Sequence, residues 1–181
     1  MDRALEARFR DLAEQLDLEV YRLEVDKIRP SMSIRLKCQI PICEYFDNCK
    51  VCPPNIPTVD EFREALKDYS RAFLVVYKER IDRIETYRND FSAELKLQDG
   101  VAALESTAQQ LGFYRALGLC VGGCKLCETC TPKGEPCRHP FKARPSPEGF
   151  GIDITELARA VGVEVEWPPK KHVNFMGLLL V

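Results

Sequence analysis

Regularly spaced cysteines are the residues of this chain best suited to chemistry. Cys124, Cys127 and Cys130 recur at three-residue steps, and six residues separate Cys130 from Cys137. Three sulfurs at this spacing lie on one tight loop, and the fourth arrives from a separate turn. Because thiolates are soft ligands that gather on transition metals, the segment predicts a metal site.

The even three-residue steps favour an iron–sulfur cluster over zinc. They match the ferredoxin-like pattern C-x2-C-x2-C with a later fourth Cys, which holds a cubane cluster. Zinc sites more often combine two separate Cys pairs. We therefore predict a [4Fe–4S] cluster on Cys124, Cys127, Cys130 and Cys137, with zinc or a purely structural use of the thiols as alternatives.

Another group of cysteines lies earlier in the chain, within residues 38–55. It is called the first cysteine group below, and Cys124 to Cys137 the second. The members of the first group are Cys38, Cys43, Cys49 and Cys52. Three prolines and an Asp-Asn pair keep this backbone in loops, which lets sulfurs converge on one centre. Pro53 directly follows Cys52, as in ferredoxin loops, where proline turns the chain away from the metal. The segment predicts a second metal centre, with a zinc knuckle or free buried thiols as alternatives.

Nine cysteines in a chain that we expect to be cytoplasmic point to metal ligation and not to disulfides. Disulfides do not persist in a reducing compartment, so clustered thiols there are metal ligands. An odd count fits eight ligands plus one spare thiol, and we expect Cys120 to be a small buried apolar residue. So many thiols suggest an anaerobic or strongly reducing setting.

Bulk properties predict one ordinary globular domain. The chain has 181 residues, 30% of them charged, and a net charge of −2. This balance argues against a nucleic-acid binder, which is normally basic. No apolar run is long enough to span a bilayer, and the charged N-terminal residues lack an apolar signal core. We expect a cytoplasmic protein with no membrane association.

The pattern of helices and strands predicts an α/β fold. Helices are predicted for 5–16, 58–69, 81–111 with a break at Asp99-Gly100, and 154–160; strands are predicted for 20–25, 72–77, 113–120, 163–167 and 172–181. Thr58 and Glu61 form a capping box, and Asp153 can cap the last helix. We predict residues 1–181 to form a single domain with a single mixed β-sheet, packed helices, and two cysteine-rich metal-binding loops at 38–55 and 120–147.

The residues around the second cysteine group suggest how it is positioned. The strand predicted over 113–120 runs directly into Gly122-Gly123, whose backbone can approach a cluster closely and donate amides to its sulfides. Arg138, His139, Lys142 and Arg144 follow Cys137 and either hold an anionic ligand or offset the charge of the thiolates. We expect Arg138 and His139 to contact the cofactor.

The chain resembles a family of predicted metal-binding proteins, domain of unknown function 2284. The resemblance rests on Cys38-Gln-Ile-Pro-Ile-Cys43, on Cys52-Pro-Pro-Asn55, on Gly123-Cys124 through Cys130, and on Cys137-Arg-His-Pro through Asp153. It implies an iron–sulfur or related metal role in anaerobic-type metabolism. Cys49 and Cys120 are not regular members of the family pattern, so the resemblance favours Cys38, Cys43 and Cys52 as ligands of the first site and an iron with an open position.

Three functions remain open from the sequence. The first is electron transfer to a redox protein partner through one or two [4Fe–4S] clusters. The second is an iron–sulfur enzyme or activating factor with an open iron at Cys38–Cys52 that acts on a small anionic or sulfur-containing ligand. The third is a zinc-stabilised interaction module. No nucleophile motif or phosphate-binding loop identifies a catalytic residue, and Glu164 and Glu166 are expected to face solvent.

Overall fold

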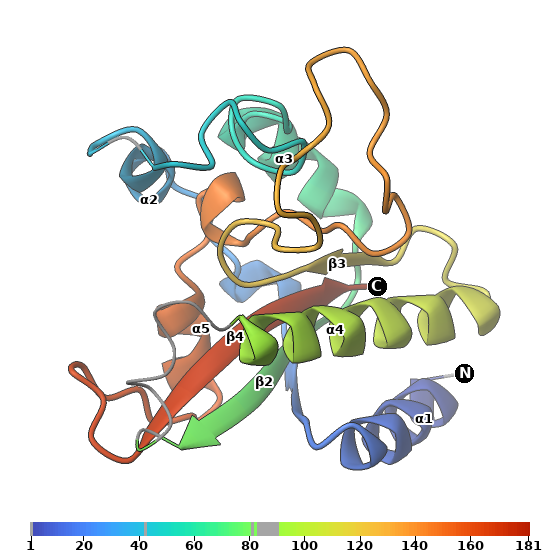
Figure 1. Ribbon diagram of the computed structural model, residues 1–181. Helices are drawn as coiled ribbons and strands as arrows, with labels where there is room; N and C mark the ends of the chain where they lie inside the picture. Colours follow the sequence, from blue (N-terminus) through green and yellow to red (C-terminus); the bar gives the residue numbers. More distant parts are fainter. Residues whose placement is uncertain (1, 42, 81, 83–90) are drawn as a thin grey trace.

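A four-stranded sheet forms the centre of the molecule. The computed structural model describes residues 2–41, 43–80, 82 and 91–181 (Figure 1). The strands are β1 (Glu19–Leu23), β2 (Ala72–Arg80), β3 (Leu117–Leu119) and β4 (His172–Leu180), in the order β1-β2-β4-β3. Each neighbouring pair is antiparallel, and β2 and β4 pair along their whole length from Ala72 opposite Leu180 to Arg80 opposite His172. The α/β fold with one sheet is confirmed, and its strands are antiparallel where a mixed sheet was predicted.

Helices cover both faces of this sheet. Helices α1 (Asp2–Gln15) and α4 (Ser92–Gln110) lie on one face, against Phe73, Val75 and Leu179. Helices α3 (Val59–Ala65) and α5 (Ile154–Ala160) lie on the other, against Leu74 and Leu178. Because side chains of a strand alternate between faces, consecutive apolar residues of β2 and β4 contribute to two hydrophobic cores, one on each face of the sheet. Complete burial of one such apolar side chain stabilises the folded state by about 1.5–3 kcal/mol.

Short helical turns connect the longer elements. They are η1 (Val25–Lys27), α2 (Met32–Arg35), η2 (Leu36–Cys38), η3 (Leu66–Asp68) and η5 (Glu148–Phe150). Figure 1 shows the cyan loop after η2 beside the yellow-to-orange loop after β3. The Lys50 ammonium joins them by donating to the Pro132 carbonyl at 2.6 Å. The two cysteine-rich segments thus meet at one edge of the sheet, beyond β3.

Several predicted elements are confirmed. The opening helix is α1, and the strand predicted over 20–25 is β1. Thr58 and Glu61 form the capping box, since the Glu61 N–H donates to the Thr58 hydroxyl at 3.2 Å and the Thr58 N–H to the Glu61 carboxylate at 2.7 Å. The Asp153 carboxylate accepts from the N–H groups of Thr155 and Glu156, as an N-cap should.

Other predictions are corrected by the structure. Residues 163–167 do not form a strand, and the Glu164 carbonyl accepts a hydrogen bond from the Asn174 side chain instead. The strand predicted over 113–120 shortens to β3, because Phe113 belongs to the turn that ends α4 and its N–H donates to the Ala108 carbonyl.

Helix α4 also differs from its prediction. It runs without a break through Asp99 and Gly100. Gly100 serves packing, since a Cβ there would lie 2.3 Å from Leu18 Cδ1. The helix predicted from residue 81 falls largely on residues 81 and 83–90, outside the described part of the chain. None of the described helices combines the length and apolar character needed to cross a bilayer.

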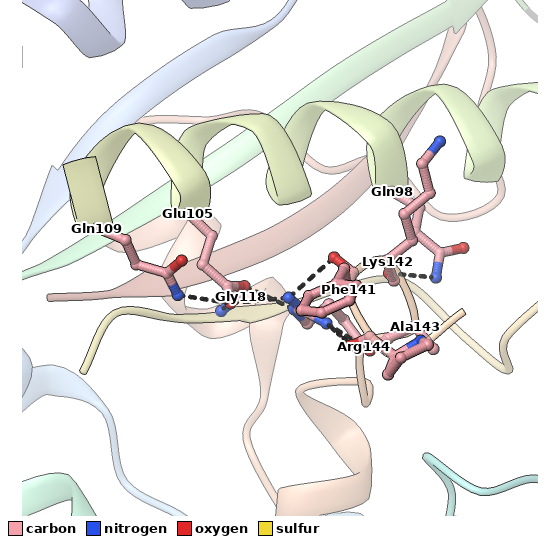
Figure 2. Close-up of polar contacts among 9 residues, drawn as sticks. Gln98, Glu105, Gln109, Gly118, Phe141, Lys142, Ala143 and Arg144 are labelled. Carbon is pink, nitrogen blue, oxygen red and sulfur yellow. Dashed lines mark hydrogen bonds and ion pairs between the residues drawn. The ribbon is translucent and has the colours of Figure 1, made fainter. Parts of the chain in front are cut away.

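A buried ion pair joins α4 to β3 and to the segment after Cys137 (Figure 2). The Arg144 guanidinium donates to both carboxylate oxygens of Glu105, at 2.6 and 2.8 Å. The same carboxylate accepts the Gly118 N–H at 2.8 Å. Arg144 also donates to the carbonyls of Pro140, Phe141 and Ala143. The second cysteine loop is therefore fixed to the sheet edge by a charge pair whose side chains are only 14% and 6% exposed.

Breaking this pair should destabilise the protein strongly. We expect Arg144→Met to lower the free energy of unfolding by about 3 kcal/mol, because Glu105 is left as a buried unpaired charge. Urea denaturation of the metal-free protein measures the change. The exposed pair Arg22–Glu6 supplies the control, and Arg22→Met should cost less than about 1 kcal/mol. Equal effects of the two substitutions would contradict the assigned role of Arg144.

Candidate metal centre

A cavity of about 250 Å³ lies between the two cysteine-rich loops. Five thiols line it, four from the later loop and one from the earlier: Cys124, Cys127, Cys130, Cys137 and Cys49. All five are free cysteines. The cavity is many times larger than the space that one ion or one water needs. Residues about 75 positions apart in the chain thus supply thiols to the same space.

Cys49 is the residue that brings the two groups into contact. Its thiol hydrogen-bonds with the thiols of Cys124 and Cys52, and the Cys124 main chain also hydrogen-bonds with Cys52. The hydrogen bond with Cys49, followed by burial, raises the pKa of Cys124. A hydrogen bond from Cys49 lowers the pKa of Cys52, against the effect of burial. These hydrogen bonds thus shift the pKa values of Cys52 and Cys124 in opposite directions.

Cys38, Cys43 and Cys52 lie outside the described lining of the cavity. The Cys43 N–H donates to the Cys38 carbonyl at 3.0 Å, which closes the loop between them. Burial, and then the neighbouring Cys43, raise the pKa of Cys38. The cysteines predicted as one group of four are thus divided, with Cys49 at the cavity and the other three beside it.

Cys120 is a buried thiol away from the cavity. It is 3% exposed, as expected of a small apolar residue, and its N–H donates to the Pro145 carbonyl at 2.8 Å. Burial raises the pKa of Cys120 to about 12. Such a thiol stays protonated at neutral pH and is a poor metal ligand.

Gly123 allows the later loop to pack tightly on the earlier one. A Cβ at this position would lie 2.4–2.6 Å from ring carbons of Tyr45. Only glycine therefore lets the backbone just before Cys124 rest on that ring. The Gly-Gly segment serves the contact between the loops, in addition to any approach to a bound group.

A buried lysine stands beside the thiols. The Lys125 side chain is 10% exposed, and its ammonium donates to the Gly123 carbonyl at 3.0 Å. It lies 4.0 Å from a Glu94 carboxylate oxygen and about 5 Å above the rings of Tyr45 and Phe91. A cation enclosed by a carboxylate and two aromatic faces keeps its charge close to the site.

Two further polar groups face the thiols. The Gln98 amide nitrogen lies 3.9 Å from Cys124 Sγ and 3.1 Å from the Lys142 carbonyl oxygen (Figure 2 shows the second contact). The Thr131 hydroxyl, on a residue that lines the cavity, is buried and has no hydrogen-bond partner among the residues that the structure describes. A buried hydroxyl without a partner is costly, so this atom marks a place where a bound group can accept its hydrogen bond.

The four basic residues after Cys137 have different surroundings. Arg138 and His139 line the cavity; Arg138 donates to the Thr129 carbonyl at 2.8 Å, and the His139 N–H donates to Cys137 Sγ at 3.3 Å. Lys142 pairs with Asp99 at 2.8 Å, and Arg144 is held by Glu105. Arg138 and His139 are therefore the two placed to contact a bound group.

Zinc and an iron–sulfur cluster need different arrangements of thiols. Zinc requires four sulfurs at about 2.3 Å from one centre. A cluster gives each thiolate its own iron, so its ligands lie further apart. Among the described residues, no three Cys, His, Asp or Glu side chains are grouped to hold a single metal ion. The five thiols that line the cavity form a candidate metal site.

Comparison with protein families gives one match. The profile of the predicted metal-binding proteins DUF2284 matches residues 21–181. The chain belongs to this family. Searches of curated proteins and of solved structures give no match. The family description agrees with the cysteine-rich site and leaves the metal open.

Sequence reasoning did not find several residues of this DUF2284 site. Gln98 and Glu94 come from α4, which carries no metal-ligand motif. Tyr45 lies in the earlier cysteine-rich loop, but only the packing of the later loop shows that its ring contacts Gly123. The sequence contained only a weak indication that Cys49 belongs with the later cysteines. Cys49-Lys-Val-Cys52 repeats the C-x2-C step of the later loop.

The unpartnered hydroxyl gives a direct test. Thr131→Val keeps the shape of the side chain and removes the donor, so we expect a bound cluster to be retained with a lower reduction potential. One hydrogen bond of about 1 kcal/mol corresponds to a shift on the order of 40 mV for one electron. Redox titration followed by electron paramagnetic resonance measures it. Thr129→Val, on an exposed residue of the same cavity, should shift the potential less.

The enclosed ammonium gives a second test. Lys125→Met removes a positive charge and keeps the length of the side chain, so the reduced and more negative state loses stabilisation and the potential should fall. Lys142→Met, which removes an exposed charge paired with Asp99, is the matched control. A larger shift in the control than in Lys125→Met would rule out a role for Lys125 in setting the potential.

Proposed function

We propose that the protein holds a [4Fe–4S] cluster in the cavity between its two cysteine-rich loops and transfers electrons to a redox partner protein. One observation carries the proposal: five thiols from two distant loops line one cavity of about 250 Å³, four of them with the spacing of a cluster loop. When bound, such a cluster takes up and releases single electrons.

Four of the five thiols have the spacing of a cluster loop. We assign Cys124, Cys127, Cys130 and Cys137 as ligands, and Cys49 as the neighbour that hydrogen-bonds with Cys124. The His139 N–H to Cys137 Sγ is the kind of main-chain contact that stabilises a thiolate. Lys125 and Arg138 supply positive charge against the negative ligand set. Together these residues would hold the cluster, offset its charge and limit water at its inner side.

The outer rim of the cavity supports electron transfer to another protein. Glu128, Thr129 and Arg138 line the cavity and are exposed, so the cluster site opens toward solvent on this side. Phe141, 87% exposed, lies four residues after Cys137. A partner that approaches this rim comes close to the thiols without a change in the fold. A soluble cytoplasmic redox protein is the partner we expect.

A second candidate function is an enzyme or activating factor with an open iron. The position of Cys49 favours it, because Cys38, Cys43 and Cys52 then remain as a group of three thiols. A cluster on three thiolates has one iron free for a non-thiolate ligand. Arg138 and His139 line the cavity of the later cysteines, so they are not placed to hold a substrate at an iron on Cys38, Cys43 and Cys52.

Metal analysis tests the proposed function. Protein purified without oxygen should contain iron and sulfide, absorb visible light, and give a paramagnetic signal after reduction. Cys127→Ser should lose at least the iron of one cluster, about four atoms per chain, whereas Cys120→Ser should keep its iron because Cys120 is buried away from the cavity. Colourless protein with about two zinc ions per chain, as closed structural sites would hold, would contradict an iron–sulfur role.

A further inference from the structure

The segment from Cys49 to Cys52 forms one closed turn. The Cys52 N–H donates to the Cys49 carbonyl at 3.2 Å, which is the hydrogen bond of a β-turn. Such a turn brings its first and fourth Cα atoms to within about 7 Å, and a disulfide joins Cα atoms about 4.4–6.8 Å apart. The two thiols also hydrogen-bond with each other. The turn thus places the two cysteines in the range of separations at which a disulfide forms.

Neighbouring residues hold this turn in place. The Asn55 side-chain amide donates to the Cys49 carbonyl at 3.2 Å, and the Asn55 N–H donates to the Cys52 carbonyl at 2.9 Å. Lys50, inside the turn, donates to the Pro132 carbonyl of the later loop at 2.6 Å. Cys49 and Cys52 are buried, at 4% and 7% exposed. The two thiols are therefore fixed next to each other and shielded from solvent.

The later loop repeats the same spacing without such a turn. Cys124, Cys127 and Cys130 also stand three residues apart. Among the described residues, no backbone hydrogen bond joins Cys124 to Cys127 or Cys127 to Cys130, and these three thiols are partly exposed. The open loop leaves its thiols free to spread around a metal group, whereas the closed turn pairs Cys49 with Cys52.

A line of sulfur contacts connects this pair with the cavity. The Cys49 thiol hydrogen-bonds with Cys52 on one side and with Cys124 on the other. Cys49 and Cys124 both line the cavity. In a reducing compartment a disulfide is transient and serves redox chemistry. A cysteine pair in contact with a ligand of the proposed cluster is placed for that use.

We propose that Cys49 and Cys52 form a reversible dithiol–disulfide couple next to the cavity, which stores two electrons. In the oxidising direction the Cys49–Cys52 S–S bond forms and the S–S bond of a small organic disulfide breaks, and both thiol protons pass to the two thiols released. In the reducing direction the protein S–S bond breaks and takes up two electrons and two protons. The redox partner of the proposed function is the reductant.

This inference rests on the proposed function only for the source of the electrons, since the disulfide itself needs no metal. It uses Cys52, which the alternative with an open iron requires as a ligand. A disulfide between Cys49 and Cys52 and an iron on Cys52 therefore exclude each other.

Mapping of the disulfide tests the couple. Protein purified without oxygen is incubated with oxidised glutathione, quenched in acid, unfolded, alkylated and digested for mass spectrometry. We expect a disulfide between Cys49 and Cys52 that reduced dithiothreitol reverses. Cys52→Ser should lack it, and Cys120→Ser, which removes a buried thiol away from the cavity, should keep it. Alkylation of both Cys49 and Cys52 after this treatment, or a disulfide of either one with another cysteine, would overturn the proposal.

Electron counting separates this inference from the proposed function. The oxidised protein is titrated without oxygen with dithionite and a viologen mediator, and iron is measured in the same sample. We expect uptake of about three electrons per chain, one by a cluster and two by the disulfide, and about one in Cys52→Ser. Iron-free protein that takes up about two electrons, and none in Cys52→Ser, would support the couple while the proposed function fails. Equal uptake by the unaltered protein and Cys52→Ser would overturn the couple and leave the proposed function standing.

Discussion

The buried ion pair between Glu105 and Arg144 is the contact on which the rest of the site depends. It joins the long helix α4, the edge strand β3 through the Gly118 N–H, and the segment that follows Cys137. Two charges removed from water are stable only as a well-formed, hydrogen-bonded pair. The three elements must therefore pack so that the Glu105 carboxylate and the Arg144 guanidinium stay in contact. The thiol Cys137 and the cavity that it lines keep their place because this arrangement is rigid.

The same physics of buried charge recurs around both cysteine groups. Lys125 is enclosed beside Cys124 by Glu94 and two aromatic rings. Arg35 is enclosed beside Cys38 with only main-chain carbonyls as its recorded acceptors. Thiolate ligand sets are strongly negative, and desolvating them without a nearby cation is costly. Each group of thiols thus has a cation of its own close to it.

Cys49 is the thiol that connects the two cysteine-rich loops. It lines the cavity together with four cysteines of the later loop and hydrogen-bonds with Cys124. It also hydrogen-bonds with Cys52, so that the two cysteine groups are in contact. The sequence left the role of Cys49 open, and the contact between distant loops places it at the cavity.

The sequence by itself determined the elements whose signals are local. Thr58 and Glu61 cap α3, Asp153 caps α5, and the apolar runs of β2 and β4 follow from residue types a few positions apart. The cysteine spacing likewise predicted thiol-rich loops, because ligands three residues apart share a loop in any fold. Only the tertiary structure decided that Gly100 continues a helix, that Arg144 is an internal partner of Glu105, and that Cys49 lines the same cavity as the later cysteines. These are contacts between residues far apart in the chain, which depend on how helices pack on the sheet, and no local pattern of residues specifies that packing.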